Sequence, residues 1–185
     1  MKKMLLLLLF ACSISYGQKL TVTPDGFKNS DDLDKSFVVI AADGKTASQL
    51  YNETLKYIAK NYKNPDEVVK GKIENEYLKV ITHATDFIII KNSFAKVPIS
   101  ADYTFELSFK DGKIKYEIVS LDMYDKSRKF KLLFQGEGAF TGYYIYNKKG
   151  ELKKPEGKTE LENYFNTKII TIEDFVKNKP SVDKW

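Results

Sequence analysis

The sequence predicts an α+β domain in which helices flank a run of antiparallel strands. Capping boxes at Thr46–Gln49 and Thr159–Glu162 each precede apolar residues at three- and four-residue spacing, as in amphipathic helices. Between them, Asp111-Gly112 joins two segments in which apolar and polar residues alternate, a strong signal of a β-hairpin. At 185 residues, these elements favour a single mixed domain.

The first 17 residues have the pattern of a secretory signal peptide. Lys2 and Lys3 precede an apolar core, Met4–Ala11, and small or polar residues continue to Gly17. We therefore expect export, to the periplasm, the cell envelope or the medium. Lipid anchoring at Cys12, the only cysteine, is the less favoured alternative because the residues before it fit a lipobox poorly.

The next elements follow in order along the chain. Residues 18–35 combine turn residues with few large apolar groups, which predicts a short strand or a loose leader. The β-branched run Phe37–Ile40 predicts a buried strand, and the first helix follows it and ends before Asn64-Pro65. Residues 68–90 predict two further strands with a turn at Glu74–Glu76.

The Asp111-Gly112 turn also predicts the register of the hairpin. A two-residue turn places Phe109 opposite Ile114 and Glu106 opposite Glu117. Apolar residues then meet apolar residues on one face, and a slip of one residue would destroy this match.

The C-terminal third predicts an extension of this core. An alternating run after Arg128 and the tyrosine-rich run that follows it favour an extra antiparallel hairpin. The second capping box predicts a C-terminal helix from Thr159 onward. We therefore expect residues 36–124 to form the core, and residues 125–185 to pack on it as a hairpin and a helix.

Residues 36–124 resemble a family of exported bacterial proteins that is catalogued as a domain of unknown function with a TBP-like fold. The resemblance is carried by Leu50-Tyr51, Ala59–Tyr62, Phe105–Lys113 and Lys115-Tyr116. It implies a TBP-like α+β fold: strand, helix and four antiparallel strands, followed here by the extra hairpin and the C-terminal helix. It implies no activity, because the family has no assigned catalytic residues.

Composition disfavours several kinds of partner. Arg128 is the only arginine among 30 basic residues, and lysine lacks the planar fork that makes bidentate contacts to phosphate and guanine. With export, this predicts no nucleic-acid partner. With a single histidine, His83, and no cysteine after the signal, we expect no metal or cofactor. No later run is apolar for long enough to predict a transmembrane segment in the mature chain.

Patterns that resemble catalytic motifs lack the expected context. Ser93 and Lys96 match the Ser-x-x-Lys tetrad of penicillin-recognising enzymes, but they lie between a strand and Pro98, and Ser181–Lys184 matches equally well. Gly136, Gly138 and Gly142 precede a predicted strand, whereas a nucleotide-binding loop precedes a helix. The carboxylate pairs Glu74 with Glu76 and Asp122 with Asp125 fall in predicted turns or strand ends. We therefore expect no catalytic residues.

Tyr143, Tyr144 and Tyr146 are the candidate partner-binding residues. Aromatic rows stack on sugars or bury apolar groups of a partner, although these rings can also simply cover the sheet. The sequence predicts a non-catalytic envelope protein that binds a protein, peptide or glycan through its sheet. The alternative is an exported hydrolase that uses His83 or a carboxylate pair.

Overall fold

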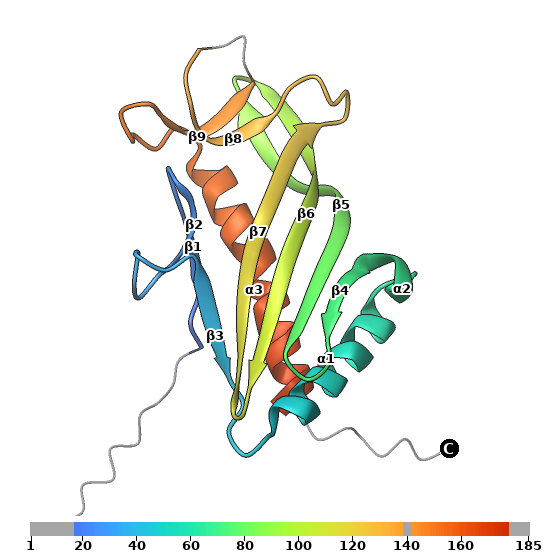
Figure 1. Ribbon diagram of the computed structural model, residues 1–185. Helices are drawn as coiled ribbons and strands as arrows, with labels where there is room; N and C mark the ends of the chain where they lie inside the picture. Colours follow the sequence, from blue (N-terminus) through green and yellow to red (C-terminus); the bar gives the residue numbers. More distant parts are fainter. Residues whose placement is uncertain (1–16, 139–141, 178–185) are drawn as a thin grey trace, which may run out of the picture.

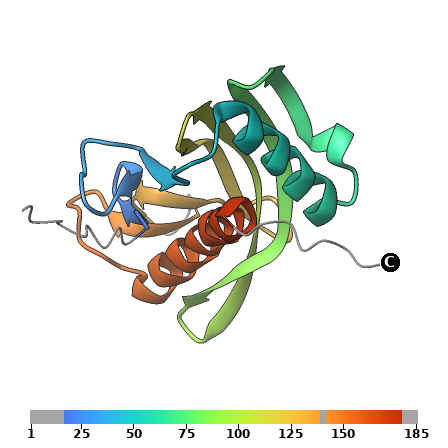
Figure 2. The same ribbon diagram turned by 90° about the horizontal axis from the view of Figure 1, so that it is seen from below.

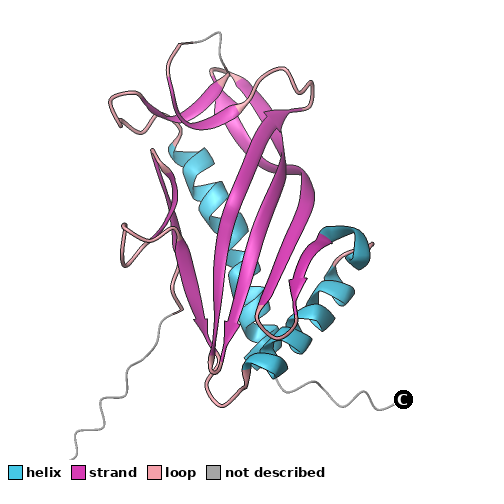
Figure 3. Ribbon diagram, viewed as in Figure 1, coloured by secondary structure: helices cyan, strands magenta, loops and turns pink. Residues whose placement is uncertain are grey.

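The computed structural model describes residues 17–138 and 142–177. The rest of the predicted signal peptide, with Cys12, and the tetrad Ser181–Lys184 lie outside these ranges. The centre is a five-stranded antiparallel sheet in the order β3-β7-β6-β5-β4 (Figures 1 and 3). Its strands are β3 (Phe37–Ala41), β4 (Val69–Ile73), β5 (Tyr77–Asn92), β6 (Ala95–Lys110) and β7 (Lys113–Asp125).

Two helices cover one face of this sheet. α1 (Ala47–Asn61) contacts β6 and β7, α3 (Pro155–Lys177) contacts β5, and the helices contact each other (Figure 2). The sheet side chains beneath them form much of the core and include Leu78, Val80, Phe105, Leu107, Ile114 and Tyr116. The predicted α+β class, with strand, helix and four antiparallel strands in that order, is confirmed.

The start of α1 is held from two directions. The Thr46 hydroxyl accepts a hydrogen bond from the Gln49 amide, and the Gln49 side chain accepts one from the Thr46 amide, so the predicted capping box is present. The Asp111 carboxylate accepts a hydrogen bond of 2.8 Å from the Ala47 amide. The β6–β7 turn therefore fixes where α1 begins.

The predicted register of the β6–β7 hairpin is confirmed. Phe109 lies opposite Ile114, and Glu106 lies opposite Glu117. The repulsion between the two carboxylates is relieved by Lys115, whose ammonium is 2.8 Å from Glu117.

Residues 20–29 form an antiparallel pair of short strands, β1 (Leu20–Thr23) and β2 (Gly26–Asn29). Glu162 of α3 holds this pair. Its carboxylate accepts hydrogen bonds of 2.7 Å from the Thr21 hydroxyl and 2.8 Å from the Val22 amide. The N-terminal segment is thus tied to the C-terminal helix.

The prediction of an extra antiparallel hairpin is wrong. β8 (Leu132–Gly136) and β9 (Tyr143–Asn147) pair in parallel, so the chain returns to the start of β8 before β9 begins. Gly142 makes this return possible. It has a φ of +121°, and a Cβ there would lie 2.4 Å from the Lys131 carbonyl oxygen. Only glycine fits so close to the neighbouring backbone.

The predicted start of the C-terminal helix is also wrong. α3 begins at Pro155, and the Thr159 hydroxyl donates to the Pro155 carbonyl within the first turn, so it does not cap the helix. Proline suits a first helical position because an amide there has no intrahelical partner. Of the predicted apolar stripe, Leu161, Phe165, Ile169, Ile172 and Val176 are buried, and Phe175 is partly buried against the core.

Candidate ligand-binding groove

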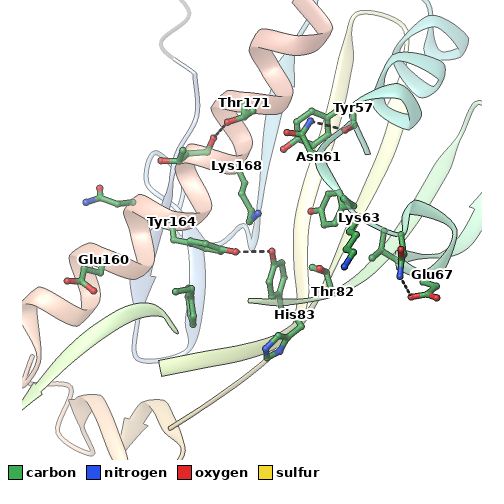
Figure 4. A pocket seen from close by; sticks show the side chains of 17 residues that line it. Tyr57, Asn61, Lys63, Glu67, Thr82, His83, Glu160, Tyr164, Lys168 and Thr171 are labelled. Atoms are coloured by element: carbon green, nitrogen blue, oxygen red, sulfur yellow. Dashed lines mark hydrogen bonds between the residues drawn. The ribbon is translucent and has the colours of Figure 1, made fainter. Parts of the chain in front are cut away.

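A groove of about 950 Å³ lies between the C-terminal end of α1, α2 (Pro65–Val68), β5 and α3 (Figure 4). We call it the α1–α3 groove. Its lining is rich in tyrosine rings and side-chain amides. The tyrosines are Tyr57, Tyr62, Tyr103 and Tyr164, and the amides are Asn61, Asn64 and Asn163.

Packing holds the aromatic floor of the groove in place. Tyr103 of β6 is only 2 % exposed, and its hydroxyl lies 3.3 Å from that of Tyr164 on α3. Tyr164 also packs edge-on against Phe87, with the ring centroids 4.8 Å apart. Phe165 packs edge-on beneath Tyr103 at 5.3 Å. These rings are ordered by the core, so a ligand meets a preformed surface.

The buried tyrosines keep their protons at neutral pH. Burial raises the pKa of Tyr57, Tyr62 and Tyr103, because the phenolate charge is poorly solvated there. Their hydroxyls are therefore neutral groups that can both donate and accept hydrogen bonds.

The groove also contains cations without a carboxylate partner. Lys168 of α3 is half-buried, and its ammonium lies 4.9 Å from the ring centroid of Tyr164 and 5.9 Å from that of Tyr62. Within the described ranges, neither Lys168 nor Lys63 forms an ion pair. The nearby Glu160 carboxylate accepts a hydrogen bond of 2.6 Å from the Ile89 amide.

His83 lies at the edge of the groove, in a polar cluster on β5, β6 and β7. Its Nδ1 is 2.8 Å from an Asp102 oxygen, and its Nε2 is 3.0 Å from the Thr85 hydroxyl. The Tyr124 hydroxyl donates to the other Asp102 oxygen at 2.8 Å, and Arg128 lies 3.5 Å from that oxygen. The only histidine and the only arginine of the chain thus both contact the Asp102 carboxylate.

Asp102 remains ionised in this cluster. Partial burial alone would raise the pKa of its carboxyl. Hydrogen bonds from Tyr124 and His83 and the charge of Arg128 outweigh burial and hold this pKa below its ordinary value. The arrangement follows from strand register, because His83 and Asp102 are directly opposite each other in β5 and β6.

The three predicted partner-binding tyrosines lie on β9, outside the α1–α3 groove. The Tyr146 hydroxyl donates to the Val22 carbonyl oxygen at 2.9 Å. Tyr143 and Tyr144 line a smaller cavity of about 310 Å³. Binding of a partner at these residues stays a prediction.

The other motif residues have no catalytic context in the described part of the chain. Ser93 lies in the exposed turn between β5 and β6, Lys96 lies in β6, and no helix begins there. Gly142 leads into strand β9. Glu74 and Glu76 lie in the β4–β5 turn, Asp122 pairs with Lys131, and Asp125 accepts hydrogen bonds from Ser127.

Neither a cluster of metal ligands nor a membrane-spanning helix occurs among the described residues. In that part of the chain, no three histidine, aspartate or glutamate side chains gather as they would to hold a metal ion. No helix within it is both long and apolar enough to cross a membrane.

Sequence reasoning missed the groove because its walls come from distant segments. Tyr62 and Tyr164 are 102 positions apart in the numbering; Tyr62 is the C-cap residue after α1, and Tyr164 lies in α3. One local signal was present: Tyr164 and Lys168 are four residues apart, and this spacing places them on one helical face.

The described chain is an α+β domain with an antiparallel sheet and two helices on one face. Residues 37–124 match the model of a family described as domain of unknown function (DUF4468) with TBP-like fold. The resemblance and the TBP-like fold expected from the sequence are therefore confirmed.

A solved structure is also similar. It is a DUF4468 family protein from Bacteroides ovatus, with a TM-score of 0.52 and 12 % sequence identity, covering 79 % of this chain and 86 % of that one. At this identity the likeness supports the fold alone. No curated protein matches the sequence.

Proposed function

We propose that the protein is an exported, non-catalytic protein of the bacterial envelope that binds a glycan in the α1–α3 groove. The observation that carries this proposal is the preformed groove of about 950 Å³, whose lining combines tyrosine rings with amides and hydroxyls. Export rests on the pattern of residues 1–17. The proposal places the ligand between the helices, with sheet residues such as Tyr103 as the floor.

The lining chemistry favours a sugar over an apolar ligand. A sugar ring has C–H groups that pack on an aromatic face and hydroxyl groups around its rim that need polar partners. Tyr62, at the end of α1, and Tyr164, on α3, supply aromatic surface to this lining, and Lys168 lies over both rings. Asn163 and the Tyr103 and Tyr164 hydroxyls supply donors and acceptors between them.

An array of soluble neutral and acidic oligosaccharides tests the proposal. We expect retention of at least one class, and at least a tenfold loss of affinity in Tyr62→Ala, because aromatic residues at binding sites commonly contribute about 2 kcal/mol. Tyr144→Ala is the matched control, since it removes a tyrosine from β9 and leaves the groove intact. Unfolding curves confirm that both variants are folded.

Two results would contradict this function. One is a complete absence of retained oligosaccharides. The other is a glycan whose affinity falls in Tyr144→Ala and is unchanged in Tyr62→Ala, because that pattern would place the site on β9.

The cluster around His83 supports a second candidate, an exported hydrolase. The exposed Thr85 hydroxyl is 3.0 Å from His83 Nε2, and His83 Nδ1 is 2.8 Å from Asp102. This order of hydroxyl, imidazole and carboxylate is the one that activates a nucleophile in acyl transfer. The hydroxyl would attack an ester carbonyl and pass its proton to Nε2, which would then protonate the leaving alkoxide. Water would release the acyl group.

Hydrolysis of p-nitrophenyl acetate tests this candidate. Under it, the full chain releases p-nitrophenol faster than buffer does, and both His83→Ala and Thr85→Ala abolish the excess. Thr85→Ser retains the excess because it keeps the hydroxyl. A rate that is equal in the parent chain and in Thr85→Ala would exclude the hydrolase.

A further inference from the structure

The turn between β5 and β6 presents an aromatic side chain entirely to solvent. Phe94 is 106 % exposed, more than any other large apolar residue of the described chain. It lies in a two-residue turn in which Ser93 adopts a left-handed φ of +55° and Asn92 pairs with Ala95. A phenylalanine held so far from the core adds no buried apolar area to the fold.

Basic side chains flank this ring. Lys91 and Lys96 are directly opposite each other in β5 and β6, a like-charge pair that destabilises a sheet. Glu156 neutralises Lys91 at 2.6 Å, while Lys96 forms no ion pair within the described ranges. Ile89, which is 44 % exposed, lies opposite Pro98, and this pair is two positions further from the turn than Lys91 and Lys96. The tip thus combines apolar groups with a lysine, Lys96, that has no ion-pair partner in the described part of the chain.

The same end of the molecule carries further aromatic and basic groups. Asn92 of the tip lines one cavity together with Tyr143, Tyr144, Lys153 and Lys154. The end of the β5–β6 hairpin reaches the same end of the molecule as β8 and β9 (Figure 1). Seen from below, it projects past the start of α3 (Figure 2).

We propose that the β5–β6 tip is a peripheral anchor that docks this end of the protein onto an anionic phospholipid surface, with the Phe94 ring inserted among the acyl chains. Tyrosine at the edge of the apolar layer and lysine at the headgroups occupy the positions that these residues prefer in a bilayer interface. The lysines select anionic over neutral lipid by charge complementarity. The proposal is independent of the ligand bound in the groove.

Vesicle binding by the full chain tests the anchor. Two vesicle types are compared, one of mixed phosphatidylglycerol and phosphatidylcholine, the other of phosphatidylcholine alone. We expect the parent chain to sediment with the anionic vesicles, and Phe94→Asp to bind about tenfold more weakly. Lys96→Glu should lose several-fold on anionic vesicles and nothing on neutral ones. Leu33→Asp, at an exposed leucine in the loop before β3, is the matched control and should bind as the parent does.

A fluorescence measurement locates the insertion. Phe94→Trp combined with Trp185→Phe leaves one indole, at the tip. We expect its emission to shift to the blue, and to be quenched by brominated acyl chains, on anionic vesicles only. Every variant keeps the same N-terminal segment, so differences among them report the tip alone. Equal vesicle binding of the parent and Phe94→Asp, absence of binding to either vesicle type, or an indole that keeps its aqueous emission would each overturn the proposal.

Discussion

Glu162 connects the N-terminal strand pair to the last helix. Burial would raise the pKa of its carboxyl, but hydrogen bonds from Lys158, the Val22 amide and the Thr21 hydroxyl, together with the Lys158 charge, outweigh burial and lower this pKa below 4.5. A carboxyl whose pKa is lowered by folding stabilises the protein above its unfolded-state pKa. This stabilisation is lost as the pH falls through the folded-state pKa.

We predict that Glu162→Gln lowers the free energy of unfolding by about 2 kcal/mol at pH 7, because charge-assisted hydrogen bonds become neutral ones. The difference between the variant and the parent should shrink as the pH falls below 4.5. Urea unfolding at a series of pH values measures it. Glu156→Gln is the control on the same helix; its exposed pair with Lys91 should contribute less than about 1 kcal/mol. A pH-independent loss in Glu162→Gln would show that packing, and not the charge, holds β1.

At the scale of elements, the local chemistry of turns, strands and caps explains which predictions from sequence were confirmed. The β6–β7 register was predictable because the turn chemistry of Asp111-Gly112 and the apolar alternation agree on one pairing. The parallel pairing of β8 and β9 was not predictable, because alternation defines a strand and says nothing about its direction. The sequence predicted the start of α3 at the wrong residue because Thr159–Glu162 has the pattern of a capping box. In the structure, Glu162 instead accepts a hydrogen bond from the Val22 amide of β1.

The parallel β8–β9 pair depends on Gly142. We predict that Gly142→Ala lowers the free energy of unfolding by about 3 kcal/mol, since the methyl group would meet the Lys131 carbonyl and the positive φ disfavours a side chain. Gly138→Ala is the control. Gly138 also has a positive φ, +78°, but a Cβ there would have no atom within 4 Å, so this substitution should cost only about 1 kcal/mol. Thermal and urea unfolding measure both. Equal losses would mean that the close approach at Gly142 does not constrain the fold.

At the scale of the whole molecule, the candidate site required the tertiary structure. In the sequence, Tyr62 appeared as a member of an apolar stripe and Tyr103 as a strand residue, while nothing singled out Tyr164. They form one surface because α1 and α3 pack on the same face of the sheet and leave a gap where α1 ends. His83 and Asp102 are neighbours through the β5–β6 pairing, which the sequence left without a register.

The groove and the β5–β6 tip adjoin each other. Glu160 lines the α1–α3 groove and also borders a shallow pocket with Ile89 and Lys96. If Phe94 docks on lipid as proposed, the Glu160 end of the groove would be the end nearest that surface. The two proposals remain separable, because Tyr62→Ala acts on the groove and Phe94→Asp acts on the tip.

Mapping of the bound glycan by NMR tests the central claim most directly. A glycan retained on the array is titrated into the isotopically labelled protein, and backbone amide shifts are followed. A ligand in the α1–α3 groove should shift the amides around Tyr62, Asn163 and Lys168 and leave those of β9 unchanged. Shifts confined to Tyr143–Asn147, or to the sheet face away from the helices, would contradict it.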